Sequence, residues 1–161
     1  MKKQGFSLIE LMVTIVIMGT IAAIAVPKLF GFMAKSKATE ITVAAGTYIK
    51  MQEAYIHEHT QGGTWFNIGY KSPAGNSTGK ASTTNFEYDA DQTVHNWMAK
   101  TLVNLNDCQK GKMWYVNYQL DPPHHMKYWA STDDDTNCLA SLIPSFRRLS
   151  TTETPITKPG E

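Results

Sequence analysis

One carboxylate lies inside a long apolar stretch near the start of the chain, and its chemistry needs an explanation. The chain has 161 residues, and Glu10 falls within an apolar run from Phe6 to Val26. A carboxylate at the centre of a membrane helix costs about 2.5–3.5 kcal/mol, and less near a helix end. Glu10 therefore either lies in water at the level of the lipid headgroups or pairs with a cation. No Lys or Arg lies within the run, so a paired cation must come from a chain terminus or from another molecule.

Several histidines and aspartates have the chemistry of metal ligands, but their spacing does not favour a metal site. His57 and His59 are two residues apart, so on a helix they do not share a face. His124 and His125 follow a proline pair, where we expect them to be solvated. The run Asp133–Asp135 lacks the alternating oxygen ligands, the Gly and the terminal Glu of a calcium loop. We expect no bound metal and no cofactor.

Neither catalysis nor nucleic-acid binding is indicated. The sequence contains no Ser/His/Asp spacing, no glycine-rich phosphate loop and no paired-carboxylate motif, so we do not expect an enzyme. The formal net charge of +1 gives no general attraction to nucleic acid.

The chain is rich in aromatic residues, with four tryptophans and seven tyrosines. We expect most of them in a hydrophobic core, but an exposed row could stack on the sugar rings of a surface polysaccharide. Trp129 and Tyr115 fall on the strand faces opposite to the apolar residues. They are therefore our candidates for exposed aromatic binding.

The apolar run that holds Glu10 is long enough to cross a membrane. A span needs about 20 apolar residues, whereas the apolar core of a secretory signal has about 7–15. The run from Phe6 to Val26 is long enough for a membrane span and longer than a signal-peptide core. We therefore expect that it is not cleaved off and remains part of the mature protein. Lys2 and Lys3 precede it, which predicts a cytoplasmic N-terminus and a head outside the cytoplasm.

The residues Gly5-Phe6-Ser7-Leu8-Ile9-Glu10-Leu11 resemble the signal of type IV prepilins. They combine a short basic leader, a Gly-Phe junction, a Glu at the fifth position after it, and an apolar run. The resemblance is firm over residues 1–30 and general over the rest. It implies that residues 1–5 are a leader that a prepilin peptidase removes between Gly5 and Phe6, and that Phe6 is then N-methylated.

The resemblance also implies a role for Glu10 in assembly. In the family, this glutamate is thought to pair with the N-terminal amine of a neighbouring subunit. A buried charge is tolerable when it is paired, so Glu10 would fix the register between subunits while the apolar faces supply most of the adhesion. Loss of Lys2 and Lys3 with the leader leaves 13 basic and 14 acidic side chains, which is close to neutral.

Helical periodicity continues well beyond the apolar run. From Ile41 to Ile56, apolar residues recur at spacings of three and four, which predicts an amphipathic helix that Gly62-Gly63 ends. We therefore expect one helix from Phe6 to about His59. Its apolar half, residues 6–30, projects, and its amphipathic half, residues 31–61, packs on the head.

Two residues interrupt this helix. Pro27 removes one helical hydrogen bond and clashes with the preceding turn, so a kink is one outcome. The resemblance implies another, because the family's corresponding segment can melt into extended chain within filaments. We predict the segment from Gly19 to Pro27 as the soft part of the helix.

Residues 62–149 are expected to form a head with a small antiparallel sheet. Period-two alternation predicts strands at Phe86–Ala90, Trp114–Leu120 and Met126–Ser131, with the last two joined by a turn at Asp121-Pro122-Pro123. Residues 94–105 fit either a helix or a strand, and we favour a strand because the neighbours form a meander. Three or four strands laid on the second half of the helix make an α+β fold.

Two cysteines, Cys108 and Cys138, bracket the last predicted hairpin. In an exported domain we expect them to pair, and the alternative is two unrelated buried thiols. The resemblance fits partly, because pilins enclose a variable C-terminal loop with a disulfide, but here the chain continues well beyond Cys138. Residues 150–161, with Pro155 and Pro159, are expected to be a flexible polar tail.

The resemblance implies a non-enzymatic structural subunit of a type IV pilus. Such a subunit is held in the inner membrane, cut and methylated, and polymerised with other pilin subunits by the pilus assembly machinery. The resulting surface fibre serves adhesion, motility or uptake. Two alternatives stay open: a type II secretion pseudopilin, whose head calcium would stabilise, and a membrane-anchored carbohydrate-binding module, which would need neither cleavage after Gly5 nor Glu10.

Overall fold

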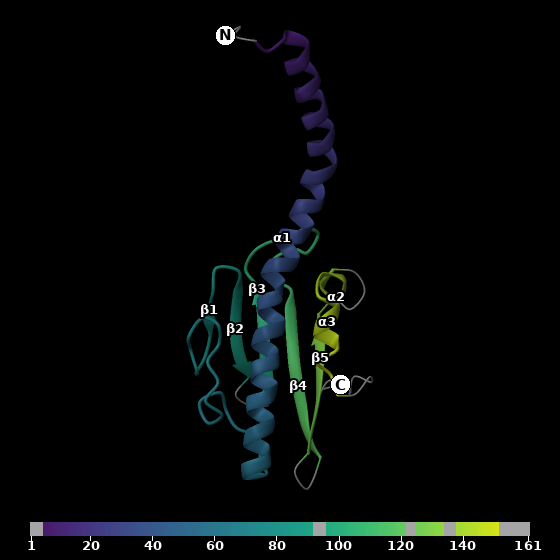
Figure 1. The fold of residues 1–161 in the computed structure, drawn as a ribbon. Coiled ribbons are helices and arrows are strands. Elements are labelled where there is room, and N and C mark those ends of the chain that lie inside the picture. Colours follow the sequence, from purple (N-terminus) through teal and green to yellow (C-terminus); the bar gives the residue numbers. More distant parts are fainter. Residues whose placement is uncertain (1–4, 92–95, 122–124, 134–137, 152–161) are drawn as a thin grey trace.

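The chain folds as one long helix followed by an antiparallel sheet (Figure 1). The computed structural model describes residues 5–91, 96–121, 125–133 and 138–151. The elements are α1 (Leu8–His59), β1 (Ala81–Ser82), β2 (Phe86–Asp91), β3 (Asn96–Thr101), β4 (Met113–Asp121), β5 (His125–Thr132), α2 (Leu139–Leu142) and α3 (Pro144–Arg147). The expected α+β class is confirmed.

Local hydrogen bonds and backbone conformation explain where α1 begins and where it ends. Ser7 precedes the helix with an extended backbone, and its N–H donates to the Glu10 carboxylate at 2.8 Å. At the other end, Thr60 takes a left-handed conformation with φ 60°, and its N–H bonds the carbonyl of Ile56 at 2.8 Å. The predicted end at His59 is confirmed, and the helix begins two residues later than we expected.

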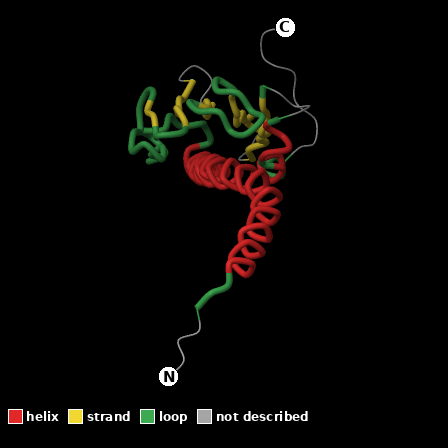
Figure 2. The backbone as a smooth tube through the Cα atoms, turned by 90° about the horizontal axis from the view of Figure 1, so that it is seen from above, coloured by secondary structure: helices red, strands yellow, loops and turns green. Residues whose placement is uncertain are grey.

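The helix is continuous through Gly19 and Pro27, and its first half leans away from the head (Figure 2). A proline is tolerated here because it removes only one hydrogen bond from a long ladder. The single chain therefore shows no break between these residues. Melting of this segment concerns the assembled filament and stays a prediction.

The sheet is a meander with strand order β1-β2-β3-β4-β5. All neighbouring strands pair antiparallel. The expected count of three or four strands was wrong, because the sheet also contains β1, a strand of only two residues. The ambiguous segment does contain a strand, β3, in which Trp97 pairs with Val116. Pro122 and Pro123 of the predicted turn lie outside the described residues.

The second half of α1 lies across one face of the sheet (Figure 2). Its buried residues recur at spacings of three and four, and they are Ala34, Ala38, Ile41, Ala44, Ala45, Tyr48, Ile49, Gln52 and Ile56. The facing strands bury Phe86, Tyr88, Trp97, Ala99, Trp114 and Val116. Several alanines on the helix allow a close approach to these large rings. Most of the tryptophans therefore belong to the core.

Hydroxyl groups also tie the helix to the sheet. The indole N–H of Trp97 donates to the Tyr70 hydroxyl at 2.9 Å, and that hydroxyl donates to the Ala44 carbonyl at 3.2 Å. The Tyr88 hydroxyl donates to the Glu40 carboxylate at 2.7 Å. Burial raises the pKa of Tyr70 and of Tyr88 above the usual value for tyrosine.

The C-terminal part of the head is held by covalent and polar links. Cys108 and Cys138 form a disulfide, with their Cα atoms 5.3 Å apart, and it encloses the β4–β5 hairpin. Thr151 and Ser150 bond the outer edge of β5: the N–H of Thr151 donates to the Tyr128 carbonyl, and the Ser150 hydroxyl accepts the N–H of Ala130, both at 2.9 Å. The first two residues of the expected tail thus lie against the head, and residues 152–161 are not described.

Candidate functional site

The predicted cleavage point lies in exposed, non-helical chain. Gly5, Phe6 and Ser7 precede α1, and the Phe6 side chain is 84% exposed. No heavy atom comes within 4 Å of the place where a side chain on Gly5 would start. A peptidase could therefore reach the Gly5–Phe6 bond without unwinding the helix. Cleavage there stays a prediction.

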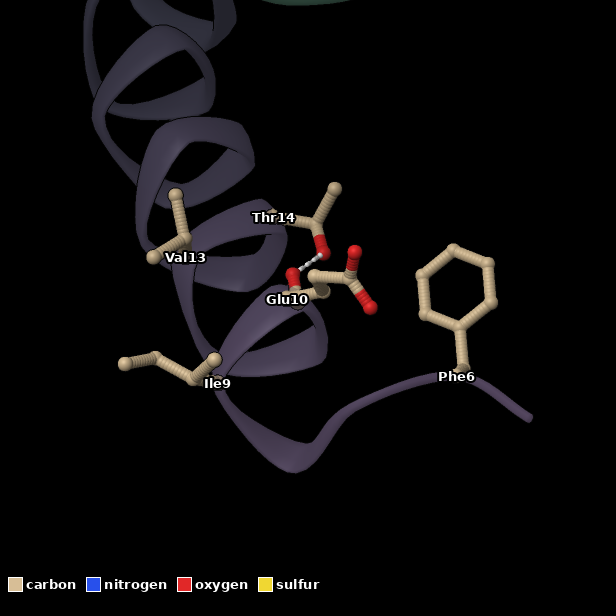
Figure 3. Close-up of a pocket in the computed structure, with 5 residues that line it drawn as sticks. All are labelled: Phe6, Ile9, Glu10, Val13 and Thr14. Carbon is tan, nitrogen blue, oxygen red and sulfur yellow. Dashed lines mark hydrogen bonds between the residues drawn. The ribbon is translucent and has the colours of Figure 1, made fainter. Parts of the chain in front are cut away.

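Glu10 lies in the first turn of α1, close to the end that cleavage would create. Figure 3 shows the Phe6 ring, the Glu10 carboxylate and the Thr14 side chain on one side of the helix, with Ile9 and Val13 on the other. These five residues line an open, mostly apolar recess. In the part of the chain that the structure describes, the ion pairs found lie in the head or at the far end of α1. The carboxylate is thus available to a cation on another molecule.

The other polar side chains of the apolar half are satisfied by their own helix. The hydroxyl of Thr14 donates to the carbonyl of Glu10, and that of Thr20 donates to the carbonyl of Ile17 at 2.8 Å. Such back-bonding lets hydroxyls enter an apolar environment without an unpaired donor. Glu10 is the one ionisable side chain among residues 6–27, so it is the one polar side chain here that carries a charge.

The first half of α1 is apolar and uncovered. It contains a segment long and apolar enough to cross a membrane, and none of that segment is buried against the head. Its exposed side chains include Leu8, Leu11, Met12, Ile15, Val16, Ile17, Met18, Ile21, Ile24, Val26, Leu29 and Phe30. An apolar surface of this extent marks a membrane or protein contact. This half of the helix therefore fits membrane anchoring or contact with other proteins.

The two candidate binding aromatics lie elsewhere, on the outward face of β4 and β5. Tyr115 pairs with Ser131 and Trp129 with Asn117, so the two rings are diagonal neighbours on adjacent strands. Both are half-buried. The Tyr115 hydroxyl donates to the Asp133 carboxylate at 2.7 Å. Burial raises the pKa of Tyr115, and the Asp133 carboxylate is a second, smaller cause of the same shift. The structure does not bring these aromatics to the Glu10 site, and ligand binding by them stays a prediction.

Both carboxylate oxygens of Asp133 accept hydrogen bonds from neighbouring residues, which indicates a structural role. One oxygen accepts the Tyr115 hydroxyl, and the other accepts the backbone N–H of Met113 at 3.1 Å. Asp134 and Asp135 lie outside the described residues. Among the residues that are described, no three His, Cys, Asp or Glu side chains are grouped to hold a metal ion.

One contact was not anticipated from the sequence. His57, in the last turn of α1, lies beside His125, the first residue of β5, with ring centres 6.4 Å apart. No local spacing signals this pair, because it depends on how the hairpin packs against the helix.

Comparisons with known proteins agree with the N-terminal geometry. The prokaryotic N-terminal methylation motif matches residues 1–26. The type IV major pilin protein PilA of Myxococcus xanthus (strain DK1622) is 34% identical over 79 residues, which is 48% of this chain and 36% of that protein. A fimbrial protein of Neisseria meningitidis serogroup A / serotype 4A (strain DSM 15465 / Z2491) is 29% identical over 171 aligned positions, 96% of this chain and 93% of that protein. No solved structure matches the chain significantly.

Three features point the same way. The methylation motif covers the Gly5–Phe6 junction and Glu10, the fold is a long helix laid on an antiparallel sheet, and the relatives are a pilin and a fimbrial protein. This chain therefore carries the prokaryotic N-terminal methylation motif and is similar to a type IV pilin and to a fimbrial protein.

Proposed function

We propose that this protein is a non-enzymatic structural subunit of a type IV pilus. A prepilin peptidase cuts it between Gly5 and Phe6, and the new N-terminal Phe6 is methylated. The helix α1 then packs against those of other subunits to build a surface filament. The names of the two relatives, a major pilin and a fimbrial protein, support this class of function.

One observation carries the proposal: the apolar half of α1 is wholly uncovered, yet its single carboxylate is placed beside Phe6 (Figure 3). A membrane anchor alone needs the apolar surface but has no need of a charge. A helix that leaves lipid for a bundle of identical helices needs both. The apolar side chains then supply adhesion, and the charge supplies register.

The physical basis of register is the high cost of an unpaired charge in an apolar bundle. Cleavage creates an amine on Phe6, and Glu10 of a neighbouring subunit provides its counter-charge. A shift of one helical turn along the bundle would separate the two charges by about 5 Å more. Misaligned neighbours are therefore selected against, even though the apolar surfaces fit in several positions.

Before assembly, the same helix holds the subunit in the inner membrane with its head outside the cytoplasm. The two lysines of the leader support this orientation, because positive residues stay on the cytoplasmic side. Afterwards the chain is part of an extracellular filament. The prepilin peptidase, the methyltransferase and the pilus assembly machinery are its expected partners.

A secretion pseudopilin would share the processing signal, so the head must separate the two roles. Both oxygens of Asp133 already accept hydrogen bonds from the protein. A head whose thermal stability does not change with calcium would support the pilus, and stabilisation by calcium would support the pseudopilin.

The Glu10→Ala substitution tests the register argument. We expect normal cleavage after Gly5, because the junction is untouched, and at least a tenfold loss of filaments in material sheared from cells. Thr14→Val is the matched control, since it changes a polar side chain in the same recess without removing a charge. Normal filament yield from Glu10→Ala would reject the register role, and an equal loss in Thr14→Val would reject its dependence on charge.

A further inference from the structure

The end of the head farthest from the apolar half of α1 is rich in histidine. Figure 1 shows the C-terminal end of α1 and the start of β5 at this same end. His57 and His125 are both exposed, their ring centres are 6.4 Å apart, and the rings are nearly perpendicular, at 85°. His59 has a different arrangement, because its ring stacks on Tyr55 at 4.1 Å within the same helix.

This separation is close to that of two imidazoles that share one metal ion. A zinc–nitrogen bond is about 2.0–2.1 Å long and zinc sites are tetrahedral, which places the centres of two ligating rings about 5 Å apart. The rings of His57 and His125 are about 1 Å farther apart than this. Since both side chains are exposed, small rotations can direct a ring nitrogen of each toward a common point.

The charges around the pair also suit a cation. Asp121 pairs with His125 across the β4–β5 ladder. The Nζ of Lys127 lies 2.6 Å from the Asp121 carboxylate. Asp121 thus neutralises this lysine and places a carboxylate beside His125.

We propose that His57 and His125 form a two-histidine site for a divalent transition metal of the zinc type. Imidazole nitrogen favours Zn²⁺, Cu²⁺ and Ni²⁺, whereas Mg²⁺ and Ca²⁺ prefer oxygen ligands. Water completes the coordination shell. The bound ion links the end of α1 to the β4–β5 hairpin, so it stabilises the far end of the head whether or not the protein polymerises.

Zinc titration of the full chain in detergent tests this proposal. We expect saturable binding of ZnCl₂ at micromolar concentration, a rise of a few degrees in the midpoint of thermal unfolding, and reversal by EDTA. MgCl₂ should have no such effect. His57→Ala and His125→Ala should each weaken zinc binding at least tenfold, while His59→Ala, the control on the same turn, should change it less than twofold.

The variants also define the results that overturn the site. Absence of saturable binding below 1 mM zinc would refute it. So would unchanged affinity in either His57→Ala or His125→Ala, because the ion would then be held by other groups. Far-UV circular dichroism before titration confirms that each variant is folded, which we expect because both side chains are exposed.

Discussion

At the scale of single residues, Glu10 has one role in the free chain and a second in the proposed filament. In the free chain its carboxylate accepts the N–H of Ser7, which satisfies a donor that the helix start leaves unpaired. In the proposed filament we expect it to pair with the amine of Phe6 on another subunit. The first role explains why a carboxylate is tolerated at this position, and the second explains why it is needed.

Residues at the end of α1 are equally specific. The Gln52 amide, fully buried, bonds the N–H and the carbonyl of Gly63 at 3.0 and 3.1 Å and accepts the Tyr118 hydroxyl at 3.0 Å. A side chain on Gly62 would begin 1.8 Å from that hydroxyl oxygen. Glycine at position 62 therefore lets the chain pass closely over β4 as it leaves the helix.

Gly62→Ala should destabilise the head by about 1–3 kcal/mol, because the Tyr118 ring must move and its bond to Gln52 is lost. Gly31→Ala is the matched control, since nothing lies within 4 Å of that position. It should be neutral or slightly stabilising, as alanine favours helix over glycine. Chemical denaturation of the two variants measures the difference, and equal stabilities would contradict this close approach.

At the scale of elements, α1 is one helix with two different environments. Its second half is amphipathic and packs on the sheet, while its first half is mostly apolar and is not buried by any of the residues that the structure describes. The disulfide between Cys108 and Cys138 acts on another element, the β4–β5 hairpin, which lies within the loop that it closes. We therefore expect the disulfide to stabilise the head and to have no effect on the apolar half of α1.

Reduction of this disulfide should lower the free energy of unfolding of the head by about 3–4 kcal/mol, the loop-closure value for a separation of 30 residues. The helicity of the apolar half should not change. Thermal unfolding with and without reductant measures the effect, and a Cys108→Ala/Cys138→Ala variant, which should not respond, is the control. The same midpoint in both conditions would show that the disulfide contributes nothing.

Sequence patterns predicted the helix and the strands in which apolar residues recur at a regular spacing, and missed the elements without such a repeat. The three- and four-residue spacing gave α1, and alternation gave β2, β4 and β5 nearly to the residue. The strand β1 has only two residues, too few to alternate. Docking of Ser150 and Thr151 on β5 depends on side-chain bonds to a strand edge, which no local pattern encodes.

The candidate sites divide in the same way. Glu10 could be found from sequence because a charge within an apolar run is a local signal. The pair of His57 and His125 could not, since it arises only when the hairpin packs beside the end of α1.

At the scale of the whole molecule, one chain is built for two environments. The head buries large aromatic rings between helix and sheet, and several tyrosines lose contact with water there. Burial, the main cause in each case, raises the pKa of Tyr118 to about 12, and those of Tyr48, Tyr70 and Tyr88 further above the usual value. The folded head thus favours the protonated, neutral form of these groups.

This predicts the direction of the pH dependence of stability. Tyrosine in an unfolded chain has a pKa of about 10, so below that pH both states keep their protons and the full stability is present. As the pH rises above about 10, the unfolded state loses protons first, and stability falls until the folded groups titrate as well.

The midpoint of thermal unfolding, followed by near-UV circular dichroism from neutral to strongly alkaline pH, measures this fall. Tyr118→Phe should reduce its slope, because one of the responsible groups is gone. A midpoint that stays constant above pH 10 would contradict the burial of ionisable hydroxyls in the head.

The measurement that tests the central claim most directly is the intact mass and N-terminal sequence of this protein in sheared surface material and in membranes. The account predicts a chain in sheared filaments that begins with N-methylated Phe6 and is lighter by the two hydrogens of one disulfide. The same processed chain found only in membranes would contradict the surface filament and favour a pseudopilin. An uncut chain that begins at Met1 would contradict the account as a whole and favour a membrane-anchored binding module.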